Sequence, residues 1–330
     1  MSETRENSGE SRRKQKISVV LPVLNEEMNL HPFYARLSTT VNLLPEYQWE
    51  FIFVDDGSTD QSYAQILELH KKDDRVKGIK LSRNFGSHSA LAAGLTQATG
   101  DAAVIMSVDL QDPPDAIRDF TAEWRKGAHV VWGMRRSRGD PWAKSFFANL
   151  FYNFCRKAVL PNYPKGGMDC GLLDRRIIDI FLNIPEKHGF LFATILWMGF
   201  KQVYVPYDRG KRTAGVSNWS FAKRLKSALD LIISFSYFPI RFMIHSGIIV
   251  SSLSILSAIV LLIGSFVFHI QYSGWSFVLS AVFFFGGIQW VMMGILGEYI
   301  WRGADQAKGR PRFIAMDEIG FETTGIKGRT

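Results

Sequence analysis

The sequence predicts an α/β domain with a mostly parallel sheet, followed by an amphipathic helix at a membrane surface and two membrane-spanning helices. Two observations support this fold class. Between positions 16 and 215, short apolar segments alternate with helical segments of roughly ten residues, which is typical of βαβ units. Apolar residues then crowd into the region from about 240 to 300, although the hydrophobic content of the whole chain, 47%, is ordinary for a globular protein.

Charge and cysteine content narrow the possible partners and compartment. The 330-residue chain has a formal net charge of +8, which suits nucleic acid, phospholipid headgroups or a phosphorylated substrate. Its two cysteines, Cys155 and Cys170, form no CxxC pair, so we expect a reducing compartment and no disulfide framework. Residues 1–15 are polar and lack the apolar core of a signal peptide, so we expect a disordered lead-in there.

The sheet domain is expected at 16–215. Its predicted strands are Lys16–Val23, Glu50–Asp56, Val76–Leu81, Ala102–Met106, His129–Gly133 and Gly199–Pro206. Its predicted helices are Glu26–Leu44, Gln61–Lys71, Ser87–Ala98 and Asp115–Lys126. Asn25 is a favourable N-cap for the first of these helices. Ala102–Met106 is an unbroken apolar run, which suits a strand buried on both faces.

Polar, loop-forming residues follow the strands of the predicted sheet. In a parallel sheet, ligands bind at the carboxyl ends of the strands. Asp109, Gln111 and Asp112 follow the most apolar strand and precede two prolines, and their oxygen atoms suit a hard cation such as Mg²⁺ or Mn²⁺. A solvated acidic turn is the alternative, but the polar ends of the other strands favour a binding site.

The phosphate-binding motifs of two large nucleotide-binding classes do not occur. No GxGxxG follows the first strand, and no GxxxxGK[ST] occurs in the chain, which disfavours a dinucleotide cofactor and a P-loop. A nucleotide held through its base, ribose and metal-bridged diphosphate fits better. Asp169 is predicted to be either a carboxylate of the site or a helix cap. The basic loop Arg209–Gly215 is predicted either to bind phosphate or to lie in solvent.

The C-terminal third predicts a membrane hairpin. Residues 216–239 are predicted to form a basic amphipathic helix, which suits either the headgroup plane or a packed surface. Residues 242–268 and 275–297 each exceed the roughly 20 apolar residues needed to cross a bilayer. Basic residues flank the outer ends of this hairpin, so we expect both termini, including a tail at 298–330, in the cytoplasm.

Several motifs together resemble glycosyltransferases of family 2, which have the A-type fold. They are Pro22-x-x-Asn25-Glu26, Asp55-Asp56-Gly57-Ser58, Arg83-Asn84-Phe85-Gly86 and Asp109-x-Gln111-Asp112-Pro113-Pro114. Later motifs resemble the polyisoprenyl-phosphate branch, which includes GtrB and dolichol-phosphate mannose synthase. These are Met168-Asp169, Trp197-x-Gly199-Phe200, Arg212-x-x-Gly215-x-Ser217 and Gly297-Glu298-Tyr299. The resemblance extends from Ile17 to Phe313.

The resemblance implies a Rossmann-like A-type domain and roles for individual residues. The implied donor-binding residues are Pro22, Leu24, Asn25, Glu26, Val54, Asp55, Asp56, Asn84, Ser107, Val108 and Asp109. The implied phosphate- or acceptor-binding residues are Arg135, Arg138, Arg209, Arg212, Ser217 and Asn218. Asp109 and Gln111 would bind Mg²⁺ or Mn²⁺, and Asp169 and Asp109 would be the catalytic carboxylates.

The implied activity is inverting transfer of a sugar from a nucleotide sugar, such as UDP-glucose, to undecaprenyl phosphate. It would take place at the cytoplasmic face of the bacterial inner membrane, in a homotetramer, and serve modification of a cell-envelope glycan such as lipopolysaccharide. The alternatives are a GDP-mannose enzyme like dolichol-phosphate mannose synthase and a non-catalytic nucleotide-sugar-binding scaffold. A processive synthase is disfavoured because QxxRW is absent, and nucleic-acid binding because the hairpin explains where the basic residues lie.

Three positions depart from the pattern of that family. Ser107 stands where the family usually has an aspartate, so a cation would have one carboxylate fewer. Asn218 stands where a lysine is frequent, which removes one expected phosphate contact. Cys170-Gly171 replaces a commoner Phe-Arg pair, which we expect to alter how the acceptor or the sugar is seated.

Overall fold

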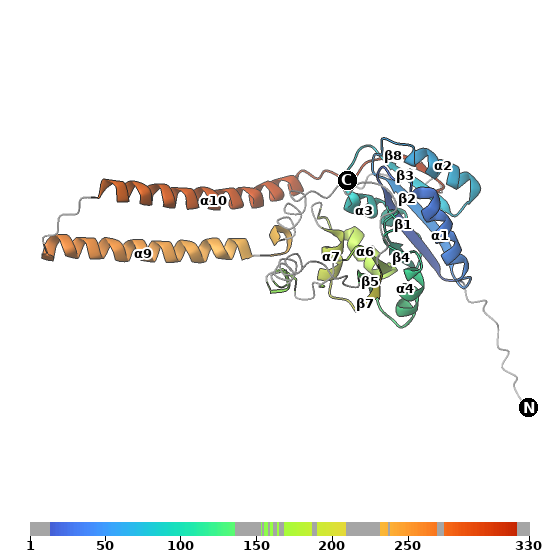
Figure 1. Cartoon of the computed structure of the whole chain (residues 1–330), viewed down its shortest axis with the longest axis horizontal. Coiled ribbons are helices and arrows are strands. Elements are labelled where there is room, and N and C mark those ends of the chain that lie inside the picture. Colours follow the sequence, from blue (N-terminus) through green and yellow to red (C-terminus); the bar gives the residue numbers. More distant parts are fainter. Residues whose placement is uncertain are drawn as a thin grey trace, which may run out of the picture.

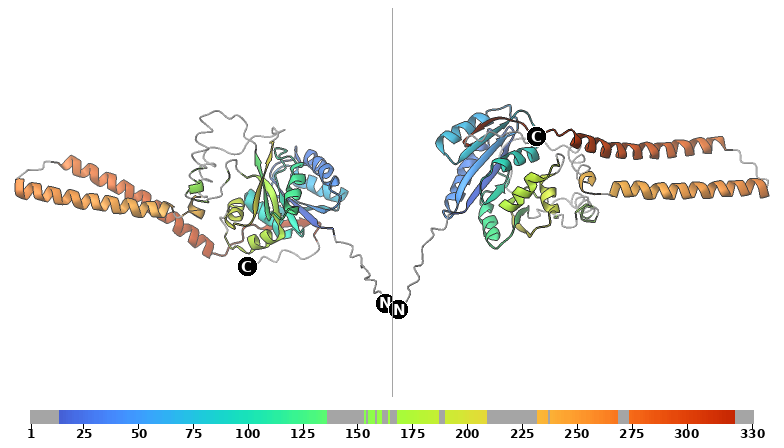
Figure 2. Two further views of the ribbon diagram at one scale, coloured as in Figure 1. Left: turned by 90° about the horizontal axis from the view of Figure 1, so that it is seen from below. Right: turned by 180° about the vertical axis from the view of Figure 1, so that it is seen from behind.

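A computed structural model of the chain shows a sheet domain from which two long helices project (Figures 1 and 2). It describes residues 14–135, 153, 155–157, 159–160, 164, 168–186, 190–208, 232–236, 238–268 and 274–321. The predicted lead-in at 1–15 and the amphipathic helix at 216–239 lie largely outside these residues.

The domain is built on an eight-stranded mixed sheet with the order β7-β5-β6-β4-β1-β2-β3-β8. Its strands are β1 (Lys16–Val23), β2 (Gln48–Asp55), β3 (Val76–Leu81), β4 (Ala102–Ile105), β5 (Val130–Arg135), β6 (Cys170–Asp174), β7 (Gln202–Tyr207) and β8 (Ala315–Ile319). The neighbours β4-β1-β2-β3 are parallel, as are β5 and β7. Only β6 and β8 run against their neighbours in this sheet. The prediction of a mostly parallel sheet is confirmed.

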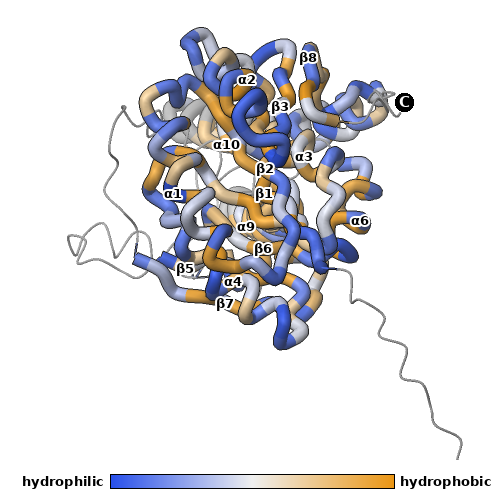
Figure 3. The backbone as a smooth tube through the Cα atoms, turned by 90° about the vertical axis from the view of Figure 1, so that its right-hand side faces the viewer, coloured by the Kyte–Doolittle hydropathy of each residue, from blue (hydrophilic) through white to orange (hydrophobic). Residues whose placement is uncertain are grey.

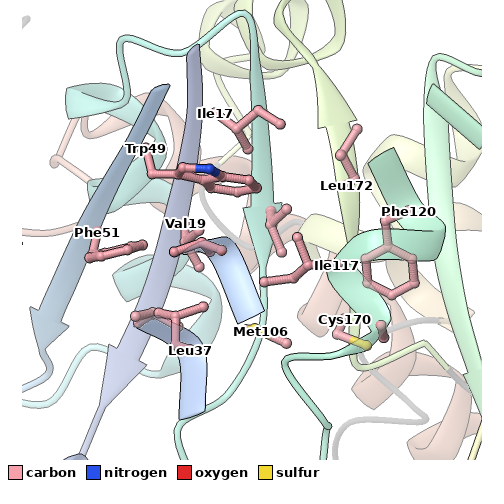
Figure 4. Packing of buried hydrophobic residues seen from close by; sticks show 14 of the residues in the cluster. Ile17, Val19, Leu37, Trp49, Phe51, Met106, Ile117, Phe120, Cys170 and Leu172 are labelled. Atoms are coloured by element: carbon pink, nitrogen blue, oxygen red, sulfur yellow. The ribbon is translucent and has the colours of Figure 1, made fainter. Parts of the chain in front are cut away.

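Helices cover both faces of the sheet. One face packs against α1 (Leu30–Asn42), α2 (Ser62–Lys72) and α4 (Ala116–Arg125). The other packs against α3 (Ser87–Gln97), α6 (Arg175–Asn183) and α7 (Leu191–Trp197). The strands between these helices are strongly apolar (Figure 3). In the core on one side of the sheet, Val19, Leu37 and Phe51 lie close together (Figure 4). Both faces of the central strands are therefore buried, which explains their continuous apolar runs.

The six predicted strands and the four predicted helices are present, but one cap was wrong. The first helix begins at Leu30, with Asn29 as its N-cap, rather than directly after Asn25. Asn25 has a left-handed backbone, φ 55°, which belongs to a turn and not to a helix start. The backbone N–H of Asn29 donates to the carbonyl of Glu26 at 2.9 Å, so a turn precedes the helix.

The strands β6 and β8 were missed, because their sequences CGLLD and AMDEI are short and show no clear alternation. The strand β8 lies within the predicted tail at 298–330 and pairs antiparallel with β3 at the edge of the sheet. The Ile319 side chain lies beside Gly78, where an added Cβ would be 2.9 Å from Ile319 Cγ1. The segment Ala315–Ile319 is therefore part of the sheet domain.

The two long helices are α9 (Phe238–Phe268) and α10 (Trp275–Ala307), which lie side by side (Figures 1 and 2). Among the described residues, one stretch, Phe238–Ser257 in α9, is apolar and long enough for a membrane span. The second crossing, predicted at 275–297, stays a prediction. The C-terminal part of α10 contacts the segment 232–236, since Tyr299 Oη donates to the Ser236 carbonyl at 3.1 Å and Arg302 Nη1 donates to Ser234 Oγ at 2.9 Å.

Candidate active site

Most of the predicted site residues that the structure describes lie at the carboxyl edge of the sheet. The parallel strands β4, β1, β2 and β3 all end at this edge, and in β1 and β2 Pro22 is paired with Val54. The loops that follow these strands are therefore neighbours, as expected for an open α/β sheet. Five predicted phosphate- or acceptor-binding residues lie outside the described residues: Arg138, Arg209, Arg212, Ser217 and Asn218.

The turn after β1 is fixed by hydrogen bonds to the turn after β2. Asn25 Oδ1 accepts from the Thr59 backbone N–H at 2.9 Å, and the Asn25 N–H donates to Ser58 Oγ at 3.0 Å. The Glu26 N–H donates to Ser62 Oγ at 2.9 Å, while its carboxylate accepts from Asn29 Nδ2 at 2.5 Å. These side chains therefore determine the shape of the turn between β1 and α1.

Asp56 connects the loop after β2 to the loop after β3. It is 2% exposed, and its two carboxylate oxygens accept from the backbone N–H groups of Phe85 at 2.7 Å and Gly86 at 2.9 Å. Burial raises the pKa of Asp56, and these two N–H groups act in the opposite direction. Gly57 has φ +75°, and a Cβ there would lie 2.6 Å from the carbonyl carbon of Arg83. Only glycine allows the two loops to approach so closely.

Asp55 has a buried oxygen that the described residues leave without a hydrogen-bond partner. The residue is fully buried, and its Oδ1 accepts from the Ser58 N–H at 3.2 Å. Its Oδ2 has no hydrogen bond within the described part of the chain, and burial raises the pKa of the carboxyl group. An unpaired buried oxygen is costly for folding, and such groups are concentrated at functional sites.

The turn after β4 presents Asp109 and Gln111. Asp109 Oδ1 accepts from Ser107 Oγ at 2.7 Å and from the Gln111 N–H at 3.1 Å, across Leu110 in a left-handed conformation, φ 60°. The side chains of Asp109 and Gln111 are half-buried and can reach a ligand. The second oxygen, Asp109 Oδ2, accepts no hydrogen bond from the described residues.

Asp112 and Tyr207 form a buried pair beneath this turn. Tyr207 Oη donates to Asp112 Oδ1 at 2.5 Å. Tyr207 is 6% exposed and Asp112 is 1% exposed. Burial raises the pKa of Tyr207, so its hydroxyl stays a proton donor. The sequence predicts Asp112 as one of three oxygen ligands for a cation. In the structure, its side chain instead accepts a hydrogen bond from Tyr207 inside the protein. Tyr207 was missed because it lies on a strand more than ninety residues away in the chain.

Arg135 and Asp169 form an ion pair at the ends of β5 and β6. The antiparallel pairing of Gly133 with Cys170 brings them together, and each side chain is about one-third exposed, 32% and 34%. The two residues were predicted for different roles, phosphate binding and catalysis. Their pairing means that the position of each depends on the other.

The oxygen ligands at the turn after β4 fit a cation whose coordination is completed by a substrate. Within the described residues, no group of three or more His, Cys, Asp or Glu side chains is arranged to hold a metal. Asp109 and Gln111 supply one carboxylate and one amide oxygen, which are hard ligands. Mg²⁺ commonly takes one or two protein ligands and completes its shell with substrate phosphates and water. The residues therefore fit a cation that protein side chains coordinate only in part, and not a closed protein site.

Comparison with known proteins gives matches over most of the chain. The model of glycosyl transferase family 2 matches residues 18–180. "Uncharacterized glycosyltransferase sll0501" of Synechocystis sp. is 34% identical, covering 93% of this chain and 96% of that protein. "Bactoprenol glucosyl transferase" of Shigella phage SfV is 36% identical, covering 92% and 99%, respectively. "Prophage bactoprenol glucosyl transferase homolog" of Escherichia coli is 35% identical, covering 91% and 98%. Each of these similarities extends over more than nine-tenths of this chain.

Proposed function

The chain belongs to glycosyl transferase family 2, and we propose that it transfers a sugar from a nucleotide-sugar donor to polyprenyl phosphate. The donor we favour is UDP-glucose and the acceptor undecaprenyl phosphate, because relatives named bactoprenol glucosyl transferases align over nearly their whole length. The anomeric carbon is inverted in this reaction. The product, a polyprenyl-phosphate sugar, would supply glucose for modification of a cell-envelope glycan.

The observation that carries this proposal is the grouping of Asp109, Gln111 and the Arg135–Asp169 pair at the end of the sheet where ligands bind. Asp109 and Gln111 would hold a Mg²⁺ or Mn²⁺ ion against the donor diphosphate. When bound, a divalent cation neutralises the charge that develops on the leaving nucleoside diphosphate. The turns after β1 and β2 would hold the base and the ribose.

The acceptor needs orientation more than it needs a general base. A phosphate monoester is already ionised at neutral pH, so its oxygen is a ready nucleophile once it is positioned behind the anomeric carbon. Arg135 is suited to bind such a phosphate, and Asp169 fixes the direction of its guanidinium group. We assign the remaining phosphate contacts to the basic loop that follows β7.

The membrane helices would bring the lipid acceptor to the site. The apolar stretch of α9 suits one crossing, and α10 exposes large apolar side chains along its length, including Val282, Phe284 and Trp290. We propose that both helices cross the bacterial cell membrane and that the domain and both termini are cytoplasmic. A reporter fused after Thr330 should then be active in the cytoplasm, and a periplasmic signal would contradict this topology. A homotetramer follows only from the family resemblance and stays a prediction.

A donor screen tests the proposed function. Membranes that contain the protein are incubated with undecaprenyl phosphate, Mn²⁺ and one radiolabelled donor: UDP-glucose, UDP-N-acetylglucosamine, UDP-galactose or GDP-mannose. We expect label in the organic phase with UDP-glucose and none with membranes that contain Asp109→Ala. Transfer from GDP-mannose alone would favour the mannose-synthase alternative. Binding of UDP-glucose without transfer of any sugar would favour the non-catalytic scaffold.

A further inference from the structure

A continuous set of contacts connects Asp109 to Tyr207 on β7. Ser107 Oγ is 2.7 Å from Asp109 Oδ1 and 3.3 Å from Asp112 Oδ2, and Tyr207 Oη is 2.5 Å from Asp112 Oδ1. We call these four residues the Asp109–Tyr207 chain. It lies entirely among residues that the structure describes, and it joins β4 to β7, which are separated in the sheet by β6 and β5.

Asp112 acts as the inner anchor of the turn that carries Asp109 and Gln111. It is 1% exposed, so its side chain cannot reach a donor in solution, although it directly follows Gln111 in the sequence. The hydrogen bond from the Tyr207 phenol to the Asp112 carboxylate is charge-assisted, and such bonds are stronger than those between two neutral groups. Because Tyr207 is also buried, this bond ties the turn after β4 to a rigid strand.

Ser107 completes the connection between Asp109 and Asp112. Its single hydroxyl proton points to Asp109 Oδ1 at 2.7 Å and is shared with Asp112 Oδ2 at 3.3 Å, as in a bifurcated hydrogen bond. Asp109 Oδ1 also accepts from the Gln111 N–H, so this oxygen has two hydrogen bonds. Asp109 Oδ2 is then the oxygen left for another ligand. A neutral hydroxyl therefore sets the orientation of the carboxylate without adding a second negative charge to it.

We propose that Tyr207 is a positioning residue for the metal-binding turn, acting on Asp109 through Asp112 and Ser107. This inference rests on the proposed role of Asp109 in holding a cation against the donor diphosphate. Tyr207 also pairs with Arg135 across β5 and β7, so the same strand end supports both the cation side and the Arg135–Asp169 side of the site. Groups behind a metal ligand typically change metal affinity by about 10- to 100-fold when removed.

The test is the affinity of full-length Tyr207→Phe for Mn²⁺ in the presence of UDP, measured from the electron paramagnetic resonance signal of free Mn²⁺. We expect binding about tenfold weaker than in the unmodified protein. The matched control is Tyr63→Phe, which removes a similar bond, 2.8 Å from Tyr63 Oη to Asp317 Oδ2, at the opposite edge of the sheet. Its Mn²⁺ affinity should not change.

Ser107→Ala provides a second variant in case Tyr207→Phe does not fold. It should also weaken Mn²⁺ binding by about tenfold, and the double variant should be no weaker than either single one, because both changes break the same chain of contacts. Unchanged Mn²⁺ affinity in a folded Tyr207→Phe, or in Ser107→Ala if only that folds, would overturn the inference. If the unmodified protein binds UDP but no Mn²⁺, the cation role of Asp109 fails and the inference with it, whereas sugar transfer is judged separately by the donor screen.

Discussion

The carboxylate of Asp56 accepts a hydrogen bond from the backbone N–H of Phe85 at 2.7 Å, although the two residues lie on different loops of the sheet. Its other oxygen accepts from the next N–H group, that of Gly86. Asp56 therefore satisfies two neighbouring backbone donors of the loop after β3 at once, as a capping side chain can do at the start of a helix. This buried side chain holds the loop that carries Asn84 against the loop after β2.

Asp56→Asn should weaken UDP binding and lower stability. An amide keeps one acceptor but points an NH₂ group at the other backbone donor, so one hydrogen bond to the loop is lost, at a cost of up to about 1–3 kcal/mol. The bond from the Gly86 N–H to Asn84 Oδ1 at 3.0 Å offsets part of this cost if the Gly86 N–H is the donor that loses Asp56. We expect a lower thermal midpoint and weaker binding of UDP by calorimetry. Asp119→Asn on the exposed face of α4 is the control and should change neither. Full retention of UDP affinity in Asp56→Asn would show that this loop does not contribute to the donor site.

Glu50 should make the stability of the domain sensitive to acid. It is 2% exposed at the opposite, amino edge of the sheet, and its carboxylate lies 2.8 Å from both Lys16 Nζ and Lys77 Nζ. Burial alone would raise the pKa of Glu50, but the bonds from Lys16, Lys77 and Ser18 lower it from 4.5 to about 2. Because the pKa in the folded state is the lower one, the stabilisation is complete above pH 4.5 and is lost as the pH falls towards 2.

The stabilisation by Glu50 is about 3 kcal/mol at neutral pH, from the conversion of a pKa shift into free energy. Glu50→Gln should therefore lower the thermal midpoint at pH 7 and reduce the further loss between pH 5 and pH 3. Glu46→Gln is the matched control, since Glu46 is 39% exposed and pairs with Arg125 at the surface. An equal response of both variants to acid would contradict the assigned cause.

Gly78→Ala tests the docking of the C-terminal strand on the sheet. An added Cβ would lie 2.9 Å from both Ile319 Cγ1 and Ile66 Cγ2, so β8 or α2 must shift, at a cost of about 1–3 kcal/mol. We expect a lower thermal midpoint, partly restored by combining the change with Ile319→Ala. Met316→Ala on the same strand is the control, because Met316 is 69% exposed. Loss of stability in Met316→Ala but not in Gly78→Ala would contradict the described packing.

The sequence predicted the parts of the fold that have strong periodicity or strong apolar character. The buried run that became β4 and the boundaries of β3 follow from local pattern alone. The strand β8 could not be predicted in this way, because its residues gain their role only from a distant partner, as Ile319 does from the space beside Gly78. The C-terminal 298–330 segment was accordingly taken for a tail.

The same limit applies to the candidate site. Asp109, Asp56 and Arg135 lie at the same edge of the sheet because the strands that precede them run in the same direction. The sequence therefore predicted their shared location from the strand pattern alone. The turn conformation at Asn25, φ 55°, and the pairing of Arg135 with Asp169 depend on backbone geometry and on cross-strand register. Tyr207 could be recognised only once β7 was placed in the sheet.

The central claim is sugar transfer to a polyprenyl phosphate that depends on the turn after β4. The most direct measurement is the rate at which the purified full-length protein converts radiolabelled UDP-glucose to a lipid-extractable product, with and without undecaprenyl phosphate. We predict product only when the acceptor and a divalent cation are both present, and a loss of at least about a hundredfold in Asp109→Ala, because the cation would lose its carboxylate ligand. Equal rates in Asp109→Ala and the unmodified protein, or formation of no lipid product from any nucleotide sugar, would contradict the account.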